Sequence, residues 1–191
     1  MAMKKGDWLL VGGAGLSAVA SPAPIVVAAD YLSVESAQRE FFPLADRFDE
    51  LTLALTTGQK QAVGALAGAQ PPHGKLRVWQ AMLGTKVLGH VFVDEVIGRQ
   101  DFITYAVAID SAGKLSAIEI LTYRESHGGE IRNTAWRKQF AGREDLSQLR
   151  FATDIKNIAG ATLSSEHVTQ GVRWLVALWQ TALKTSGVDA R

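Results

Sequence analysis

The 191-residue chain contains no cysteine. This absence excludes disulfide bonds, zinc sites with cysteine ligands, iron–sulfur clusters and haem attachment through a CxxCH motif. No excess of charge of one sign is present either, because 20 basic and 19 acidic residues leave a formal net charge of +1. A nucleic-acid-binding domain is normally markedly basic, so no nucleic-acid partner is expected. The four histidines (His73, His90, His127 and His167) are scattered without ligand spacing, and no metal site is predicted.

The N-terminal segment lacks charge over 22 residues, from Trp8 to Ala29. Two lysines precede this stretch, and small residues stand directly before Asp30, which is the layout of a secretory signal peptide. The alternative for residues 1–29 is an uncleaved membrane anchor, since 22 uncharged residues are long enough to span a bilayer. Both alternatives place the remaining chain outside the cytoplasm, in the periplasm or anchored to the periplasmic side of the inner membrane.

Residues 30–74 are expected to contain two helices and a short strand. Ser33 is a suitable N-cap for a helix over Val34–Phe42. Leucines alternate from Leu51 to Leu55 and predict a strand. A second helix is expected over Gln59–Leu66, before a loop that contains Pro71 and Pro72.

Four strand-like runs follow, over Leu76–Leu83, Val87–Ile97, Phe102–Asp110 and Leu115–Tyr123. They are rich in valine and isoleucine and are joined by short connections, one of which has the Asp and Gly spacing of a type I turn. Consecutive strands with such connections predict an antiparallel meander. One face of the sheet is expected to bury six residues: Val91, Val93, Ile103, Val107, Ile118 and Ile120.

The C-terminal third is predicted to be helical. A helix is expected from Thr134 to about Phe140, and from Ser165 onward apolar residues recur at steps of three and four. The apolar stripe of this amphipathic helix must pack on another element, most simply the sheet. The expected fold class is therefore α+β, with helices packed on an antiparallel sheet.

Just before the long C-terminal helix, small residues surround one threonine, Thr162. If Thr162 carries a phosphoryl group, Gly160 and Ala161 leave room for it. The hydroxyls of Ser164 and Ser165 are then able to donate hydrogen bonds to phosphate oxygens, and the helix N-terminus favours the negative charge. The alternative is an ordinary helix start, in which Ser164 or Ser165 caps the free amides.

The chain resembles the FMN-binding domain family, which includes the covalent-flavin subunits of the sodium-translocating NADH:quinone oxidoreductase and of the Rnf electron-transport complex. Ala159-Gly160-Ala161-Thr162 matches the family motif of a small residue followed by Gly, Ala and Thr or Ser, with Thr162 in the acceptor position. Other similar segments occur in the family's order between about Val78 and Leu178. They are Val87–Val93 with Gly89, the Asp110–Gly113 turn, Tyr123–Gly129 and Gln139–Gly142.

The resemblance implies a covalent cofactor and a site for it. Thr162 would be esterified to the phosphate of FMN by a separate Mg²⁺-dependent flavin transferase that uses FAD. Glu125, Gly128 and Gly129 would contact the ring or the ribityl chain. In the pattern that the transferase recognises, an aspartate stands six residues before the acceptor, whereas this chain has Lys156 there and Asp154 two residues further upstream.

These observations predict an exported FMN-binding electron-transfer protein, with residues 75–191 as the FMN-binding domain. It would relay electrons to or from a membrane reductase or a haem-bearing partner. We expect an electron carrier rather than a stand-alone enzyme, because no acid–base or nucleophile arrangement is found beyond Glu125 and His127. The alternatives are a flavin-free periplasmic interaction domain with the same fold and an FMN-dependent oxidoreductase with its own substrate.

Overall fold

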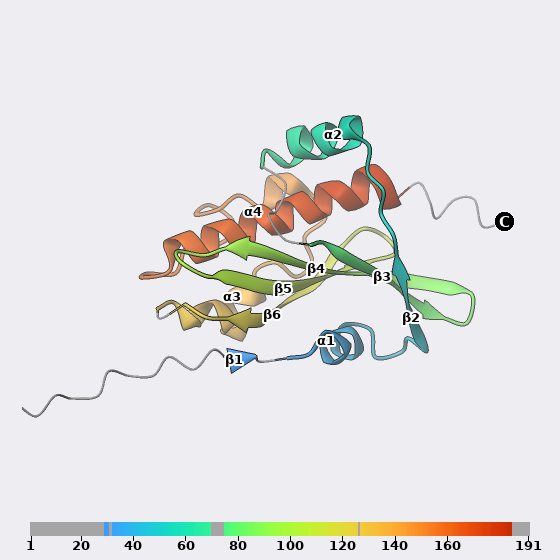
Figure 1. The fold of residues 1–191 in the computed structure, drawn as a ribbon, viewed down its shortest axis with the longest axis horizontal. Helices are drawn as coiled ribbons and strands as arrows, with labels where there is room; N and C mark the ends of the chain where they lie inside the picture. The colour runs from blue at the N-terminus through green and yellow to red at the C-terminus, as the bar shows by residue number, and fades with distance from the viewer. Residues whose placement is uncertain (1–28, 31, 70–74, 126, 185–191) are drawn as a thin grey trace, which may run out of the picture.

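The computed structural model describes residues 29–30, 32–69, 75–125 and 127–184. Within these ranges a six-stranded antiparallel sheet has the order β1-β6-β5-β4-β3-β2 (Figure 1). Its strands are β1 (Ala29–Asp30), β2 (Arg47–Leu51), β3 (Arg77–Leu83), β4 (Lys86–Ile97), β5 (Phe102–Asp110) and β6 (Leu115–Tyr123). From β2 to β6 the order follows the chain, which confirms the predicted meander. The expected signal peptide or anchor lies outside the described residues, apart from Ala29.

Helices cover both faces of the sheet. Helix α4 (Thr162–Leu178) lies on one face with α2 (Thr57–Ala67) above it, and α1 (Val34–Phe41) lies on the other face (Figure 1). The α+β class is therefore confirmed. None of the helices in the described part of the chain combines the length and the apolar character needed to cross a membrane.

The prediction that one face buries six residues is wrong. Val91 and Val93 pack on the α1 side, with Phe42 and Ala37 respectively. The other four lie in the larger cluster under α4. Successive side chains of a strand point to opposite faces, and both faces here are covered. Residues of either parity are therefore buried, and burial alone does not reveal which face a strand residue occupies.

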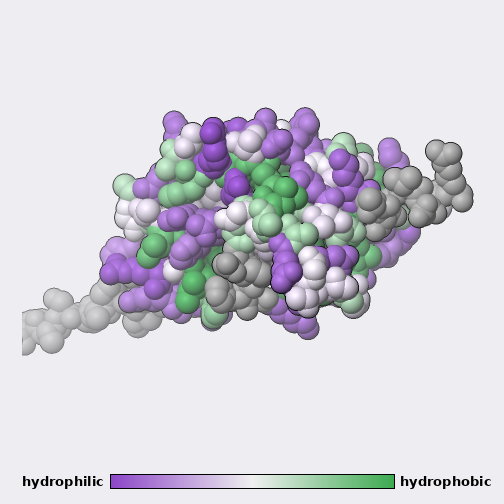
Figure 2. All heavy atoms as spheres, turned by 90° about the horizontal axis from the view of Figure 1, so that it is seen from above, coloured by the Kyte–Doolittle hydropathy of each residue, from purple (hydrophilic) through white to green (hydrophobic). Residues whose placement is uncertain are grey.

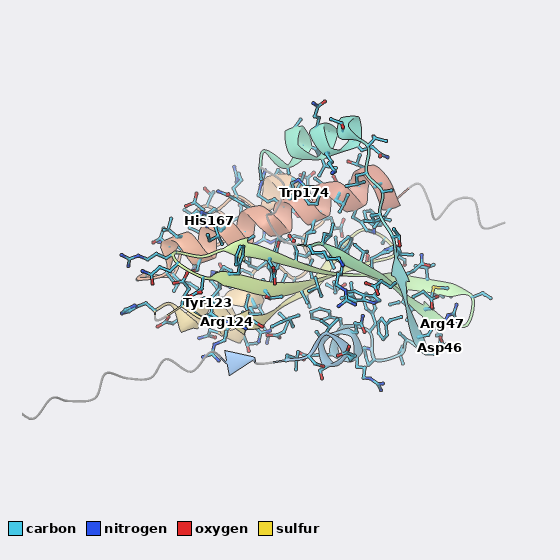
Figure 3. The ribbon with its side chains drawn as sticks, in the orientation of Figure 1. Asp46, Arg47, Tyr123, Arg124, His167 and Trp174 are labelled. Atoms are coloured by element: carbon cyan, nitrogen blue, oxygen red, sulfur yellow. The ribbon has the colours of Figure 1, made fainter. Side chains whose placement is uncertain are left out.

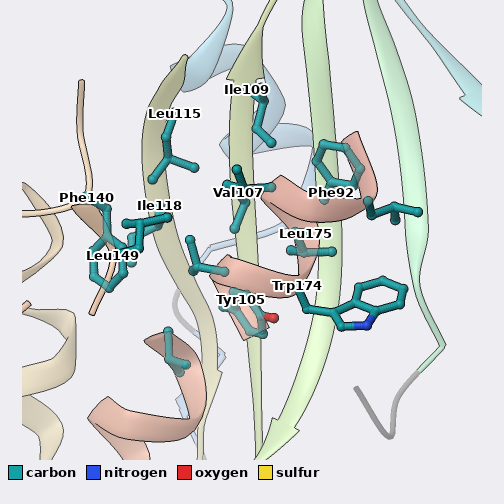
Figure 4. Close-up of a cluster of buried hydrophobic side chains, with 14 of the residues drawn as sticks. Phe92, Tyr105, Val107, Ile109, Leu115, Ile118, Phe140, Leu149, Trp174 and Leu175 are labelled. Atoms are coloured by element: carbon teal, nitrogen blue, oxygen red, sulfur yellow. The ribbon is translucent and has the colours of Figure 1, made fainter. Parts of the chain in front are cut away.

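The larger core lies between the sheet and α4. Tyr105 and Val107 of β5 and Phe92 of β4 are fully buried beneath Trp174 and Leu175 of α4 (Figure 4). A fully buried side chain of this size stabilises the fold by roughly 1.5–3 kcal/mol. This packing holds α4 along the sheet and therefore determines the position of its N-terminus.

Several element boundaries differ from the predictions. The strand near Leu51 lies earlier, at β2, because its ladder with β3 ends where Leu51 pairs with Val78. Leu53 and Leu55 still pack on the core, but as part of the connection to α2. Helix α2 begins at Thr57 rather than Gln59, with Thr56 as its N-cap in a capping box.

The helical region after β6 also differs in its boundaries. The predicted helix from Thr134 to Phe140 is shortened to α3 (Thr134–Arg137), and its N-cap is Asn133. Short 3₁₀ turns, η1 (Gly129–Arg132) and η2 (Leu146–Gln148), flank it. Helix α4 begins at Thr162, three residues before the predicted start, and continues as a π-helix, η3 (Trp179–Leu183).

Candidate functional site

A cleft of about 630 Å³ lies at one end of the sheet. It is lined by residues 99–100 of the β4–β5 loop, by Glu125 and His127 after β6, and by residues 160–164 at the start of α4. Tyr123, Arg124 and His167 mark this end of the molecule, whereas Asp46 and Arg47 mark the opposite end (Figure 3). The fold thus brings together three segments that are far apart in the sequence.

The start of α4 has no side-chain cap. Its N-cap residue is Ala161, and no side chain accepts a hydrogen bond from the first turn there. The N-caps of α1 and α2, Ser33 and Thr56, both accept such a bond. The predicted alternative, in which Ser164 or Ser165 caps the helix, is therefore not what the structure contains. The first-turn amides of α4 and the positive end of its dipole remain available to an anion in the cleft.

Thr162 is exposed at the first position of α4. Its Oγ1 accepts a hydrogen bond from Nδ2 of Asn157 at 3.1 Å. Gly160, two residues earlier, has a φ of +82°, in the left-handed region where a side chain would be strained. This backbone turn leads the chain into the helix with the threonine facing the cleft.

The two serines of the motif have different environments. Ser164 lines the cleft, and its Oγ lies 3.4 Å from the hydroxyl of Tyr123. Ser165 is fully buried, and its Oγ lies 2.9 Å from the carbonyl oxygen of Ala161 and 3.1 Å from Oδ1 of Asn157. Ser165 is therefore behind the cleft and supports Asn157 instead of lining the cavity.

Glu125 lines the cleft and also holds the β4–β5 loop in place. Its Oε1 accepts hydrogen bonds from the backbone amides of Gln100 at 2.7 Å and Asp101 at 3.0 Å. A Cβ atom at Gly98 would overlap the same carboxylate. The carboxylate thus fixes the loop that carries Arg99 and Gln100 into the cleft.

Gly128 lies directly against the motif that contains Thr162. Its φ is +86°, and a Cβ atom there would overlap Cβ of Ala161. The hydroxyl of Tyr123 donates to the carbonyl oxygen of His127 and so holds the preceding residue. Gly128 therefore allows its backbone to pack closely against Ala161.

Besides Ser165 and Gly128, two more predicted site residues, Gly129 and Ala159, do not line the cleft. Gly129 begins η1, and the nearest atom to a Cβ placed there would belong to Arg132. Ala159 is exposed in the turn before Gly160. The cleft instead contains Arg99 and Gln100, which were not predicted from the sequence. Asn157, which contacts Thr162 from outside the cleft, was not predicted either. Only the fold brings Arg99 and Gln100 to the cleft of Thr162. Asn157 stands five residues before Thr162, and its contact with that hydroxyl follows from the local turn.

The acidic residue nearest to Lys156 on the same loop is held by an arginine. Asp154 accepts hydrogen bonds from Nε of Arg150 at 2.8 Å and from its backbone amide at 2.9 Å. These hydrogen bonds lower the pKa of Asp154 to about 2. Lys156 itself is exposed and lies beside a smaller hollow of about 460 Å³ next to Trp136 and Ile158.

Another hollow, of about 670 Å³, lies between α2 and α4. Glycine, alanine and glutamine residues form most of its walls, together with Lys60 and Thr57. It contains no part of the Thr162 motif. On the α2–α4 face, apolar residues form small patches separated by polar ones (Figure 2). No group of three or more histidine or acidic side chains in the described ranges is arranged to hold a metal ion.

His90 and Asp94 are buried on the face of the sheet that α4 and η3 cover, outside the cleft lining. Burial lowers the pKa of His90 to about 4, and its Nδ1 lies 3.2 Å from Nε1 of Trp179. Burial raises the pKa of Asp94 to about 6, although Oδ2 accepts a hydrogen bond from the hydroxyl of Tyr105 at 3.0 Å. Both residues follow the alternation of β4 that places even-numbered side chains toward α4.

The family model of the FMN-binding domain matches residues 98–177. The matched range begins at the β4–β5 loop and ends one residue before the end of α4. It therefore contains every segment that lines the cleft around Thr162. No curated protein matches the chain.

Proposed function

We propose that this chain is an exported electron-transfer protein whose FMN is joined to Thr162 by a phosphoester bond, within residues 98–177 that the model of the FMN-binding domain matches. The family makes flavin binding the role of this domain. The observation that carries the finer proposal is the uncapped start of α4, which presents the hydroxyl of Thr162 to a cleft that also contains Arg99.

The residues of the cleft fit the phosphate end of FMN. Amides at the N-terminus of a helix bind phosphate well, and the helix dipole adds to their effect. Arg99 is exposed at the cleft and forms no ion pair with another described residue, so its guanidinium is available to a phosphate. Glu125 holds the loop that positions this arginine.

Other polar residues that line the same cleft fit the ribityl chain. Gln100 and Ser164 offer an amide and a hydroxyl, both able to donate and to accept hydrogen bonds. His127 adds an imidazole at the same wall. These residues would orient the cofactor, while Gly128 and Ala161 keep the wall behind Thr162 closely packed.

Bound FMN supplies one- and two-electron chemistry, and the protein supplies attachment and orientation. Free FMN would diffuse away from a protein outside the cytoplasm. A covalent bond to Thr162 would keep the cofactor attached there. A flavin transferase would carry out the attachment. A membrane reductase or a haem-bearing protein would exchange electrons with the holoprotein in the periplasm or at the periplasmic side of the inner membrane.

The proposal is tested by exporting the full chain from a bacterial host with and without a flavin transferase. We expect visible flavin absorption that stays with the denatured polypeptide only when the transferase is present. Thr162→Ala should abolish this retained absorption, whereas the matched variant Thr153→Ala, an exposed threonine on the nearby loop, should keep it. Retained flavin in Thr162→Ala, or none in the wild type with the transferase, would refute the attachment.

A further inference from the structure

Asn157 connects the exposed hydroxyl of Thr162 to the buried hydroxyl of Ser165. Its Nδ2 donates to Oγ1 of Thr162 at 3.1 Å, and its Oδ1 accepts from Oγ of Ser165 at 3.1 Å. An amide side chain has one donor end and one acceptor end. In the structure the NH₂ end of Asn157 faces Thr162 and the oxygen end faces Ser165. Oγ of Ser165 also lies 2.9 Å from the carbonyl oxygen of Ala161 and 3.0 Å from that of Thr162, which share its one hydrogen.

The backbone beside Asn157 is fixed by residues of the preceding helical region. The amide of Lys156 donates to Oε1 of Gln139 at 2.8 Å, and its carbonyl oxygen accepts from Nε1 of Trp136 at 2.8 Å. Trp136 is itself buried against Phe140, with their rings edge to face and 5.1 Å between centroids. The peptide that leads into Asn157 is thus held on both sides, so its side chain has a defined position.

We propose that Asn157 is a positioning residue that orients the Thr162 hydroxyl to accept the FMN phosphate, an inference that rests on the proposed attachment at Thr162. A threonine in a helix divides its χ1 angle between two rotamers. The amide hydrogen of Asn157 selects the rotamer in which Oγ1 points toward it. The hydrogen bond from Asn157 then occupies one lone pair of Oγ1. The hydroxyl hydrogen and the other lone pair point away from Asn157, so that the transferase and FAD can reach them.

The bonds that form and break during flavin transfer show which role Asn157 has in the reaction. In the transfer, a bond forms between Oγ1 of Thr162 and the FMN phosphorus of FAD. The phosphoanhydride bond of FAD breaks, and AMP leaves with the electron pair. The hydroxyl proton passes to a base of the transferase, because the NH₂ group of Asn157 donates hydrogen bonds and accepts none. Asn157 therefore acts through orientation and exchanges no proton.

The test is single-turnover flavin transfer to the full exported chain, with purified transferase, FAD and Mg²⁺, followed by intact mass. Loss of one orienting hydrogen bond in Asn157→Ala should slow transfer about tenfold at saturating transferase. The concentration of transferase that gives the half-maximal rate should stay the same. Thr153→Ala, an exposed position on the same loop, should react at the wild-type rate.

A second substitution separates orientation from a general effect on the fold. Serine lacks the γ-methyl group and is less restricted at χ1, so Asn157→Ala should slow transfer more in a Thr162→Ser background than in the wild type. An equal rate for Asn157→Ala and the wild type would overturn the inference. So would a change confined to the half-maximal concentration, which would make Asn157 a contact for the transferase. An unlabelled wild type would instead refute the proposed attachment.

Discussion

The buried His90 and Asp94 should change the free energy of unfolding with pH in opposite directions. In the wild type the two changes should therefore largely cancel. Nδ1 of His90 accepts a hydrogen bond from the indole of Trp179, which can only donate, so the folded chain keeps this imidazole neutral. Burial lowers its pKa to about 4, from 6.5 in an unfolded chain. As the pH falls from 6.5 to 4, the unfolded chain therefore takes up a proton that the folded chain does not.

The free energy of unfolding changes by about 1.4 kcal/mol for each pH unit between the two pKa values of a group. The His90 contribution is fully present above pH 6.5 and is lost on acidification toward pH 4. Asp94 has the opposite sign, because burial raises its pKa to about 6 from 3.8. Its folded form is protonated first, so its contribution is fully present below pH 3.8 and is lost as the pH rises toward 6.

The two contributions should nearly cancel between pH 4 and pH 6. Asp94→Asn removes one of them, and the variant should lose about 2 kcal/mol relative to the wild type on going from pH 6 to about pH 4.5. His90→Gln removes the other and should gain about the same amount over that interval. Urea unfolding of the three proteins at several pH values measures these differences directly. Parallel pH profiles for all three would refute the assignment of both buried groups.

Three further substitutions test the construction of the cleft. Gly128→Ala should strain the backbone and push against Ala161, lowering both FMN transfer and the melting temperature, as transfer assays and calorimetry would show. Glu125→Gln leaves one acceptor oxygen but removes the charge that holds the β4–β5 loop, and hydrogen exchange of the amides of that loop should accelerate. Arg99→Gln should weaken non-covalent FMN binding several-fold in a titration followed by fluorescence, whereas Arg124→Gln, exposed but outside the cleft lining, should leave the affinity unchanged.

Sequence patterns predict the meander well because each of its strands pairs with the next strand along the chain. Alternating Val and Ile residues and the Asp110–Gly113 turn specify neighbouring strands that follow each other in the chain. The turn forms as expected, with the amide of Gly113 donating to the carbonyl oxygen of Asp110 at 3.0 Å. What local patterns do not contain is which face a helix covers. The placement of Val91 and Val107 on opposite faces of the sheet therefore became visible only in the folded chain.

The candidate site was predictable where it forms one continuous segment. Gly160, Ala161, Thr162 and Ser164 were found from their spacing before a helix, and all four line the cleft. Arg99 was not found, because it reaches this cleft only through pairing of β4 with β5 and through the loop held by Glu125.

The roles of the supporting residues were equally invisible in the sequence. Ser164 and Ser165 are both buried, but Ser164 lines the cleft whereas Ser165 contacts Asn157 behind it. Only the direction in which α4 faces the sheet separates these two serines. The short motif thus identifies the acceptor, and the three-dimensional packing identifies the residues that prepare it.

If the proposal is correct, one hydroxyl in this cysteine-free chain carries the flavin. Trypsin cleaves after Lys156 and Arg173, so a single peptide, residues 157–173, contains Thr162, Ser164 and Ser165. Tandem mass spectrometry of this peptide from the natively exported protein tests the claim most directly. We expect a mass increase equal to FMN minus water, with fragment ions that place it on Thr162. An unmodified peptide, or fragment ions that place the flavin on another residue, would contradict it.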